Sequence, residues 1–348
     1  MKQCSFGKTE NGFETQLYIL ENIQGMEVGV TDYGARLVYV NVADRYGVYR
    51  DVVLGYNSVR EYEKDRYCFG ATIGRNANRI KLAEFRLNGK KYHLTKNEYE
   101  NNNHSGPNGY EHRIWQVESV NNQSIRFSLV SPHLDQGFPG EFRISVTYLL
   151  TEENEIIIHF QGMSDQDTIV NMTHHSYFNL AGHASGDILG QYLQINAEKY
   201  SPVQDFQFIP TGEMVNVSNT PMDFRRFKKI GQDINSEFPQ LRIAGDYNHN
   251  FILDKEEDTV GVLGEAYCQE SGILMRVKSN LPAVQLYTGR FIQDITGRGG
   301  SRYSSRSGFC LEAQYTPNAV NEENVKKPIL KAGDVYDKII SYQFQVKI

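Results

Sequence analysis

The stretch EFRISVTYLL, residues 141–150, decides the fold class because its apolar side chains recur with a period of two. Phe142, Ile144, Val146 and Tyr148 alternate with polar residues at positions 143, 145 and 147. In an extended chain, successive side chains point to opposite faces. The pattern therefore predicts a β-strand with one buried face.

The same alternation recurs before and after this stretch. SIRFSLV (124–130) and SYQFQVKI (341–348) repeat it, and Asn88-Gly89 between two short strand-like runs predicts a type I′ hairpin. EIIIHF (155–160) is a short apolar run, so we expect a strand that is covered on both faces. Helical periodicity is scarce. The sequence thus predicts an all-β fold, a large antiparallel sandwich with few short helices.

The chain has 348 residues, and length alone would suggest about two domains. Its 40% hydrophobic and 22% charged residues are typical of a globular protein rather than a disordered one. No Ser/Gly linker, low-complexity tract or obvious repeat interrupts the sequence. We therefore expect a single domain over residues 1–348.

Charge and cysteine usage argue against several classes of function. Lys and Arg total 36 against 42 for Asp and Glu, and the resulting net charge of −6 disfavours nucleic acid and anionic membranes as partners. No apolar run approaches the roughly 18 residues of a membrane span, and residues 1–20 lack the apolar core of a secretory signal. The four cysteines are far apart, which disfavours structural zinc and a disulfide framework. A cytoplasmic protein is the simplest expectation.

Candidate chemistry lies in polar clusters within apolar or loop segments, since the P-loop, zinc-protease and nucleophile-elbow motifs are absent. The clusters are GATIGRNANRI (70–80), NNNHSGPNGYEHRIW (101–115), VNMTHHSYFNLAG (170–182), GDYNHNFIL (245–253), LPAVQLYTGRF (281–291) and GFCLEAQYTPNAVN (308–321). A single histidine or arginine in such a segment is more often structural than catalytic. It is the combination of clusters that points to a site.

Together these clusters suit a neutral polyol. Asn, Gln, Arg and His side chains bind sugar hydroxyls, and an aromatic face covers the C–H surface of the ring. Glu312 follows an apolar segment, and burial would raise the pKa of its carboxyl group and make it a better base. A glycosidase needs two carboxylates, but only Glu312 stands out, with Asp246 a weaker second. The histidines could bind zinc, yet no tight spacing supports this, so a site without metal or cofactor is favoured.

These residues resemble those of a known family, the aldose 1-epimerases or galactose mutarotases. The resemblance runs in order from MEVGVTDYGARL (26–37) and DVVLGY (51–56) to the final strands, and the clusters at 170–182 and 308–321 are its most specific parts. It implies a single-domain antiparallel β-supersandwich that uses no metal or cofactor. It also implies an isomerase that interconverts the α and β anomers of free aldoses, such as glucose or galactose, by opening and reclosing the ring.

The resemblance also implies roles for particular residues. Glu312 resembles the family's general base, and His175, directly before Ser-Tyr-Phe-Asn-Leu, resembles its general acid. The implied substrate-binding residues are Asn78, Arg79, His104, Asn248 and Gln285. With an ionised Glu312 nearby, we expect the pKa of His175 to lie above about 6.5 and the ring to be protonated near neutrality.

Three positions depart from the family pattern. Asn248 stands where Asp is usual, which removes a charge, and Asp246 could partly substitute for it. Arg290 and His174 stand where Asn is common, and Arg290 would add a charge near the site. These departures leave the preferred sugar open.

The main alternative is a non-catalytic sugar-binding or sensor protein on the same fold, because one fold hosts unrelated functions. Glu312 and His175 favour an enzyme, since a pure binder needs no acid–base pair. A glycosidase or lyase remains a further alternative. So does an epimerase of phosphorylated hexoses, which would want several basic residues around the site. The expected partner is a free aldose, and the expected assembly is a monomer or weak homodimer.

Overall fold

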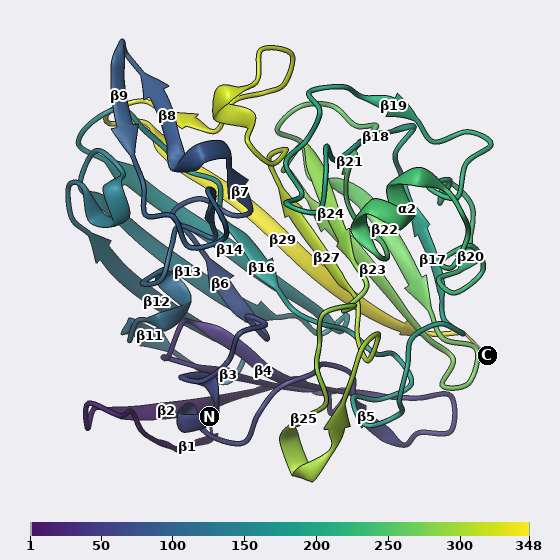
Figure 1. Ribbon diagram of the computed structural model, residues 1–348. Coiled ribbons are helices and arrows are strands. Elements are labelled where there is room, and N and C mark those ends of the chain that lie inside the picture. Colours follow the sequence, from purple (N-terminus) through teal and green to yellow (C-terminus); the bar gives the residue numbers. More distant parts are fainter. Residues whose placement is uncertain (1, 348) are drawn as a thin grey trace.

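The computed structural model describes residues 2–347 and confirms the predicted all-β fold (Figure 1). Within that range the α-helices are short: α1 (Val59–Tyr62) and α2 (Pro239–Ala244). No helix among these residues is long and apolar enough to cross a membrane. Strands therefore build the structure, as the period-two pattern predicted.

The largest sheet of the described chain has nine strands in the order β11-β12-β13-β14-β29-β23-β22-β17-β20. They are β11 (Gln116–Val120), β12 (Ser124–Ser131), β13 (Phe142–Leu150), β14 (Glu155–Ser164), β29 (Val335–Val346), β23 (Ile273–Ser279), β22 (Gly261–Tyr267), β17 (Tyr192–Ile195) and β20 (Lys228–Lys229). The long strand β29 pairs with β14 on one side and β23 on the other. It therefore joins strands that are far apart in the sequence (Figure 1).

Two five-stranded sheets accompany it within residues 2–347. The first is β1 (Lys2–Lys8), β2 (Glu14–Glu21), β3 (Glu27–Thr31), β4 (Arg36–Ala43) and β5 (Tyr49–Asp51). The second runs in the order β19 (Val215–Asn216), β18 (Lys199–Ser201), β21 (Asn248–Ile252), β24 (Ala283–Tyr287) and β27 (Cys310–Gln314). The short ladders are β6 (Ala71–Ile73) with β16 (Thr173–His175), β7 (Arg79–Ile80) with β10 (Asn102–Asn103), β8 (Glu84–Leu87) with β9 (Lys90–His93), β15 (Thr168–Ile169) with β28 (Ile329–Leu330), and β25 (Ile295–Thr296) with β26 (Arg302–Tyr303).

The alternation read from the sequence appears directly in the burial of side chains. In β13, Phe142, Ile144, Val146 and Tyr148 are buried while Arg143 is exposed. The β8–β9 hairpin confirms the predicted turn, because Asn88 and Gly89 both have positive φ, as a type I′ turn requires. The expectation for EIIIHF was wrong: Ile156, Ile158 and Phe160 are buried, but Ile157 and His159 are only half-buried. One face of β14 is thus partly open to solvent.

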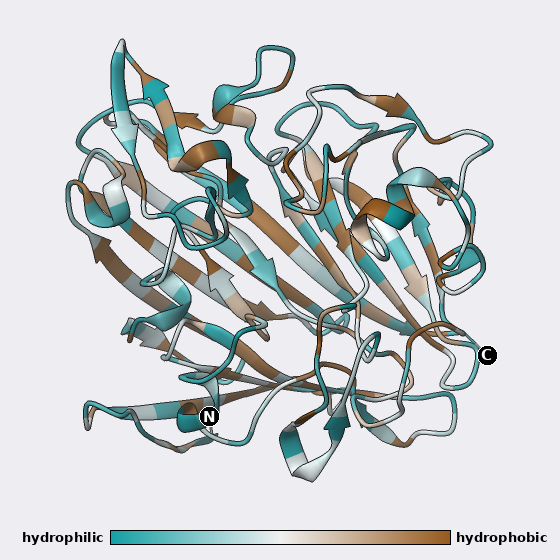
Figure 2. Ribbon diagram, in the orientation of Figure 1, coloured by the Kyte–Doolittle hydropathy of each residue, from teal (hydrophilic) through white to brown (hydrophobic). Residues whose placement is uncertain are grey.

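One large apolar cluster connects all three main sheets. It includes Val28 of β3, Val146 of β13, Met275 of β23 and Leu286 of β24, all fully buried. Apolar and polar residues alternate along the strands in Figure 2, which is how each sheet turns one face to this core. Burial of each such side chain contributes about 1.5–3 kcal/mol, so the core holds the second five-stranded sheet, which carries the site, in a fixed place.

Candidate active site

Three neighbouring strands present polar side chains on one face. Ladder pairing places Gln285 of β24 opposite Glu312 of β27, and Asn248 of β21 opposite Tyr287. Paired residues in an antiparallel sheet point to the same side, so these side chains share one surface. Gln285 Nε2 donates a hydrogen bond of 2.8 Å to Asn248 Oδ1. Segments 245–253, 281–291 and 308–321 therefore meet, although each was singled out separately.

His175 reaches this surface from β16, the strand that packs against β27. Thr173 Oγ1 donates to the carbonyl of Ala313 at 2.6 Å, and the backbone N–H of Gly70 donates to the carbonyl of His175 at 3.0 Å. Gly70 has a φ of +62°, and a Cβ there would lie 1.8 Å from the carbonyl oxygen of Leu37. Only glycine fits this close approach, which fixes the strand that carries His175.

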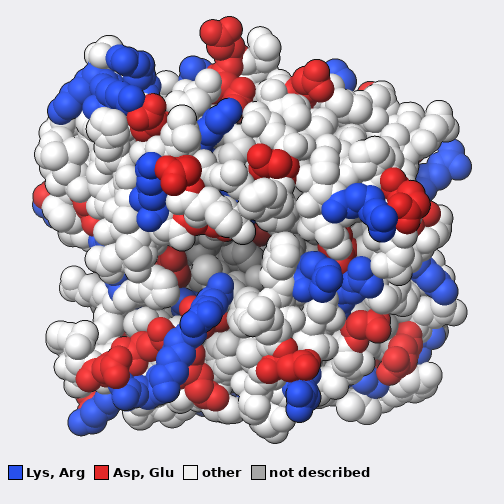
Figure 3. Space-filling model, in the orientation of Figure 1, with Lys and Arg blue, Asp and Glu red and all other residues white. Residues whose placement is uncertain are grey.

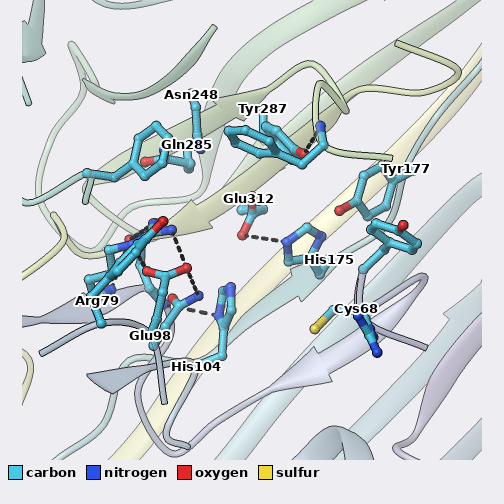
Figure 4. Close-up of a pocket in the computed structure, with 17 residues that line it drawn as sticks. Cys68, Arg79, Glu98, His104, His175, Tyr177, Asn248, Gln285, Tyr287 and Glu312 are labelled. Atoms are coloured by element: carbon cyan, nitrogen blue, oxygen red, sulfur yellow. Dashed lines mark hydrogen bonds and ion pairs between the residues drawn. The ribbon is translucent and has the colours of Figure 1, made fainter. Parts of the chain in front are cut away.

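Glu312 and His175 face each other in the wall of the site (Figure 4). Glu312 Oε2 lies 3.6 Å from His175 Nε2, and both side chains are almost fully buried. Burial raises the pKa of Glu312 to about 8, although the charge of Arg79 opposes the shift. Burial lowers the pKa of His175 to about 4. Our expectation of a raised His175 pKa was therefore wrong, because burial penalises the imidazolium and the charge of Arg36 adds to that effect, while only a backbone hydrogen bond opposes it.

His104 is held by an unusual pair of backbone conformations. Asn78 and His104 both have positive φ, at 59° and 49°, and the backbone N–H of Asn78 donates to His104 Nδ1 at 3.2 Å. Asparagine tolerates this left-handed region better than most residues. Since Nδ1 accepts this hydrogen bond, the neutral ring carries its proton on Nε2. His104 thus offers the cavity a hydrogen-bond donor.

The tautomer of His104 that carries its proton on Nε2 is unfavourable for metal binding. Ligand atoms of His104, His175 and Glu312 lie within 4.8 Å of one another, so proximity alone would suit a metal ion. A histidine ligand must present a nitrogen lone pair to the metal, however. His104 Nε2 carries a proton when Nδ1 accepts from Asn78. The trio fits the binding of hydroxyl groups better than it fits a metal.

These groups line one cavity of about 530 Å³. Every residue for which a catalytic or binding role was predicted contributes to its wall: Asn78, Arg79, His104, His175, Asn248, Gln285 and Glu312. The wall also contains residues outside the predicted clusters, namely Arg66, Tyr67, Cys68, Glu98, Tyr99 and Phe208. Tyr177 and Tyr287 lie in the predicted clusters and add aromatic surface, with Tyr177 stacked on His175 at 5.0 Å between ring centroids.

The expectation for Asp246 was wrong, and Arg290 does not itself line the cavity, although its neighbour Phe291 does. The Asp246 carboxylate pairs with Arg306 at 2.7 Å and is not part of the cavity wall, so it does not replace the missing charge at Asn248. Arg290 is exposed, and its guanidinium approaches Ser305 outside the cavity. His174 is structural, since its ring lies between the hydroxyls of Tyr148 at 2.9 Å and Ser176 at 3.1 Å.

The fold and the cavity define a class: a β-sandwich protein whose cavity pairs one buried carboxyl group with one imidazole among hydroxyl-binding side chains. Residues 16–343 match the family model described as Aldose 1-epimerase. The chain belongs to the aldose 1-epimerase family and is an isomerase.

Similar proteins agree over almost the whole length. The galactose mutarotase of Homo sapiens is 36% identical over 343 residues, which cover 98% of this chain and 96% of the relative. The aldose 1-epimerase of Escherichia coli (strain K12) is 34% identical over 336 residues, or 96% of each chain. The crystal structure of galactose 1-epimerase from Lactobacillus acidophilus NCFM matches with a TM-score of 0.87 at 27% identity, covering 100% of this chain and 99% of the other.

Proposed function

We propose that the protein interconverts the α and β anomers of free aldoses such as glucose and galactose, with Glu312 as the base and His175 as the acid. The observation that carries the proposal is the separation of 3.6 Å between Glu312 Oε2 and His175 Nε2 within one cavity. Two such groups can act on the two oxygens bound to C1 of a single pyranose. The central β29 also pairs with strands from both halves of the chain, which supports a single domain over residues 1–348.

Anomers interconvert only through the open chain. In the proposed mechanism, ionised Glu312 takes the proton of the O1 hydroxyl while protonated His175 gives a proton to the ring oxygen O5, and the C1–O5 bond breaks. Rotation about C1–C2 presents the other face of the aldehyde, and closure returns both protons. Each positioned acid or base contributes about 10²–10⁴ in rate.

The protonation state needed for this step differs from the one that burial favours. Burial places the single shared proton on Glu312, because it disfavours both charges. The reactive state holds the same number of protons but has an ionised Glu312 and a protonated His175. Sugar hydroxyls and the Nε2–H of His104 can donate hydrogen bonds to the carboxylate, and such bonds favour its charged form. We infer that sugar binding moves the proton from Glu312 to His175.

The remaining wall suits an uncharged ring. The amides of Asn78, Asn248 and Gln285 can donate to and accept from hydroxyl groups. Tyr177 and Tyr287 offer aromatic surface to the C–H side of a pyranose. We propose that these groups orient the sugar so that O1 faces Glu312 and O5 faces His175.

Polarimetry on freshly dissolved α-D-glucose and α-D-galactose tests this function. We expect Glu312→Gln to lose most of the catalysed rate, while Glu237→Gln, which changes a carboxylate on the surface, keeps it. Near-normal turnover by Glu312→Gln would remove Glu312 as the base. If His175→Asn weakens only affinity and leaves kcat unchanged, His175 is a binding residue rather than the acid.

A further inference from the structure

Arg79 is held in the cavity wall by a carboxylate that no sequence motif indicated. Its Nη2 donates to Glu98 Oε1 at 2.8 Å and its Nε donates to Oε2, so the two side chains meet through both pairs of atoms. Asn103 Nδ2 donates to the same Oε1 at 3.3 Å. The Arg79 side chain is 10% exposed and that of Glu98 27%. This bidentate, partly buried geometry makes the pair stronger than an ordinary surface ion pair.

Two loops close around this ion pair. The ring of Phe208 lies 4.8 Å from the Arg79 guanidinium, and Asn101 Nδ2 donates to Gln207 Oε1 at 3.1 Å. Tyr99 and Phe206 make an edge contact with ring centroids 5.4 Å apart. The segment that carries Glu98 is therefore tied to residues 206–208, and Tyr99 and Phe208 both line the cavity. Glu98 and Arg79 form a fixed part of the wall.

The ion pair decides the charge that a ligand meets. The charged side chains that line the cavity are Arg66, Arg79, Glu98 and Glu312, and both signs border the hollow in Figure 3. Burial keeps Glu312 protonated near neutrality, because it raises the pKa of this carboxyl group to about 8. Without Glu98, the guanidinium groups of Arg66 and Arg79 would dominate. Glu98 balances the charge of Arg79. It also accepts hydrogen bonds from the Nε–H and one Nη2–H of Arg79, so these two donors are not free to bind a ligand.

We propose that Glu98 is a specificity residue that makes the cavity favour uncharged aldoses over aldoses that carry a carboxylate or phosphate group. The inference rests on the proposed function, since it concerns which sugars that same cavity accepts. An anionic sugar would meet the Glu98 carboxylate and would find the bidentate face of Arg79 occupied. A neutral sugar can still accept hydrogen bonds from the remaining N–H groups of Arg79 without facing an excess of charge.

The test compares D-galactose with D-galacturonate, which differ in a neutral CH₂OH and an anionic carboxylate. Calorimetric titration gives Kd for each sugar with the wild type and with Glu98→Gln. We expect the ratio of Kd for galacturonate to Kd for galactose to fall about tenfold in Glu98→Gln, and the change to shrink as salt is added. Glu100→Gln is the matched control, because this carboxylate lies in the same loop but pairs with Lys96 outside the cavity. Glu98→Asp keeps the charge and should keep the wild-type ratio.

A ratio in Glu98→Gln within about twofold of the wild-type and Glu100→Gln values would overturn the proposal. The proposal would also be overturned if Glu98→Gln did not bind galacturonate at all. If Glu98→Gln does not fold, Glu98→Met removes the same charge and is judged by the same ratio. Polarimetry of wild-type protein on galactose tests the proposed function separately, because binding ratios remain measurable even when no turnover occurs.

Discussion

Replacing Glu312 by glutamine should stabilise the folded protein at alkaline pH while abolishing most of its activity. Burial raises the pKa of Glu312 to about 8, whereas the same group in an unfolded chain has a pKa of about 4.3. Between these values the folded state keeps a proton that the unfolded state has released. Stability from this group is therefore fully present below the unfolded pKa and is lost as pH rises toward 8.

The size of the effect follows from the width of that window. Each pKa unit corresponds to about 1.4 kcal/mol, so the rise from about pH 5 to about pH 8 costs the wild type about 4 kcal/mol that glutamine does not lose. The His175 ring, with its pKa at about 4, is neutral in the folded state over this range, and its protonation in the unfolded chain is common to both proteins, so it cancels from the comparison.

Urea unfolding near pH 5 and near pH 8.5 measures this difference. We expect Glu312→Gln to gain stability relative to the wild type between the two conditions, and Glu237→Gln, whose side chain is 79% exposed, to show no such gain. The difference in unfolding free energy between wild type and Glu312→Gln should change between the two pH values. A change of less than about 0.5 kcal/mol would refute the reasoning, since surface substitutions alone produce effects of that size.

Three further outcomes are expected. The value of kcat/KM should follow a bell-shaped pH curve with limbs near 4 and 8, because only the form of the Glu312–His175 pair with one proton is active and kcat/KM reports the pKa values of the free enzyme; a kcat/KM at pH 9 equal to that at pH 6 would contradict this. Asn248→Asp should reorder kcat/KM among glucose, galactose, xylose, arabinose and fucose, and an identical ranking would show that this position does not set preference. Gly70→Ala should lower the unfolding free energy by about 3 kcal/mol, because the added Cβ would meet the carbonyl oxygen of Leu37. Gly47→Ala is the control: this glycine has a similar φ but open space around it, so the loss should be only about 1 kcal/mol. Equal losses of stability in thermal melts of the two variants would argue against the clash.

The parts of the structure that the sequence predicted well depend on local rules. Period-two alternation identified β13, and Asn88-Gly89 identified a hairpin, because side-chain direction and turn type follow from neighbouring residues. Glu312 was found from its apolar neighbours, whereas the role of Gln285 came from the resemblance to a known family, and both residues line the cavity. That they share one face follows only from the pairing of β24 with β27.

Other features depend on contacts between distant segments and left no local signal. Glu98 sits in a polar loop like many others, and its importance follows only from its contact with Arg79. The pKa of His175 was misjudged because a sequence shows a charged neighbour but not the loss of water around both groups. Asp246 was misjudged for a similar reason, since its partner Arg306 lies sixty residues away.

The position of β29 has a consequence for how the protein is made. Residues 335–346 fill the centre of the nine-stranded sheet between β14 and β23, so neither neighbour is paired on that side until this segment has been synthesised. In a nascent chain on the ribosome the facing edge of β14 stays unpaired while residues 165–334 are added and that of β23 while residues 280–334 are added, and such edges invite aggregation. We therefore expect completion of the sandwich to be a late event that follows release of these residues from the exit tunnel, and chaperones to improve its yield.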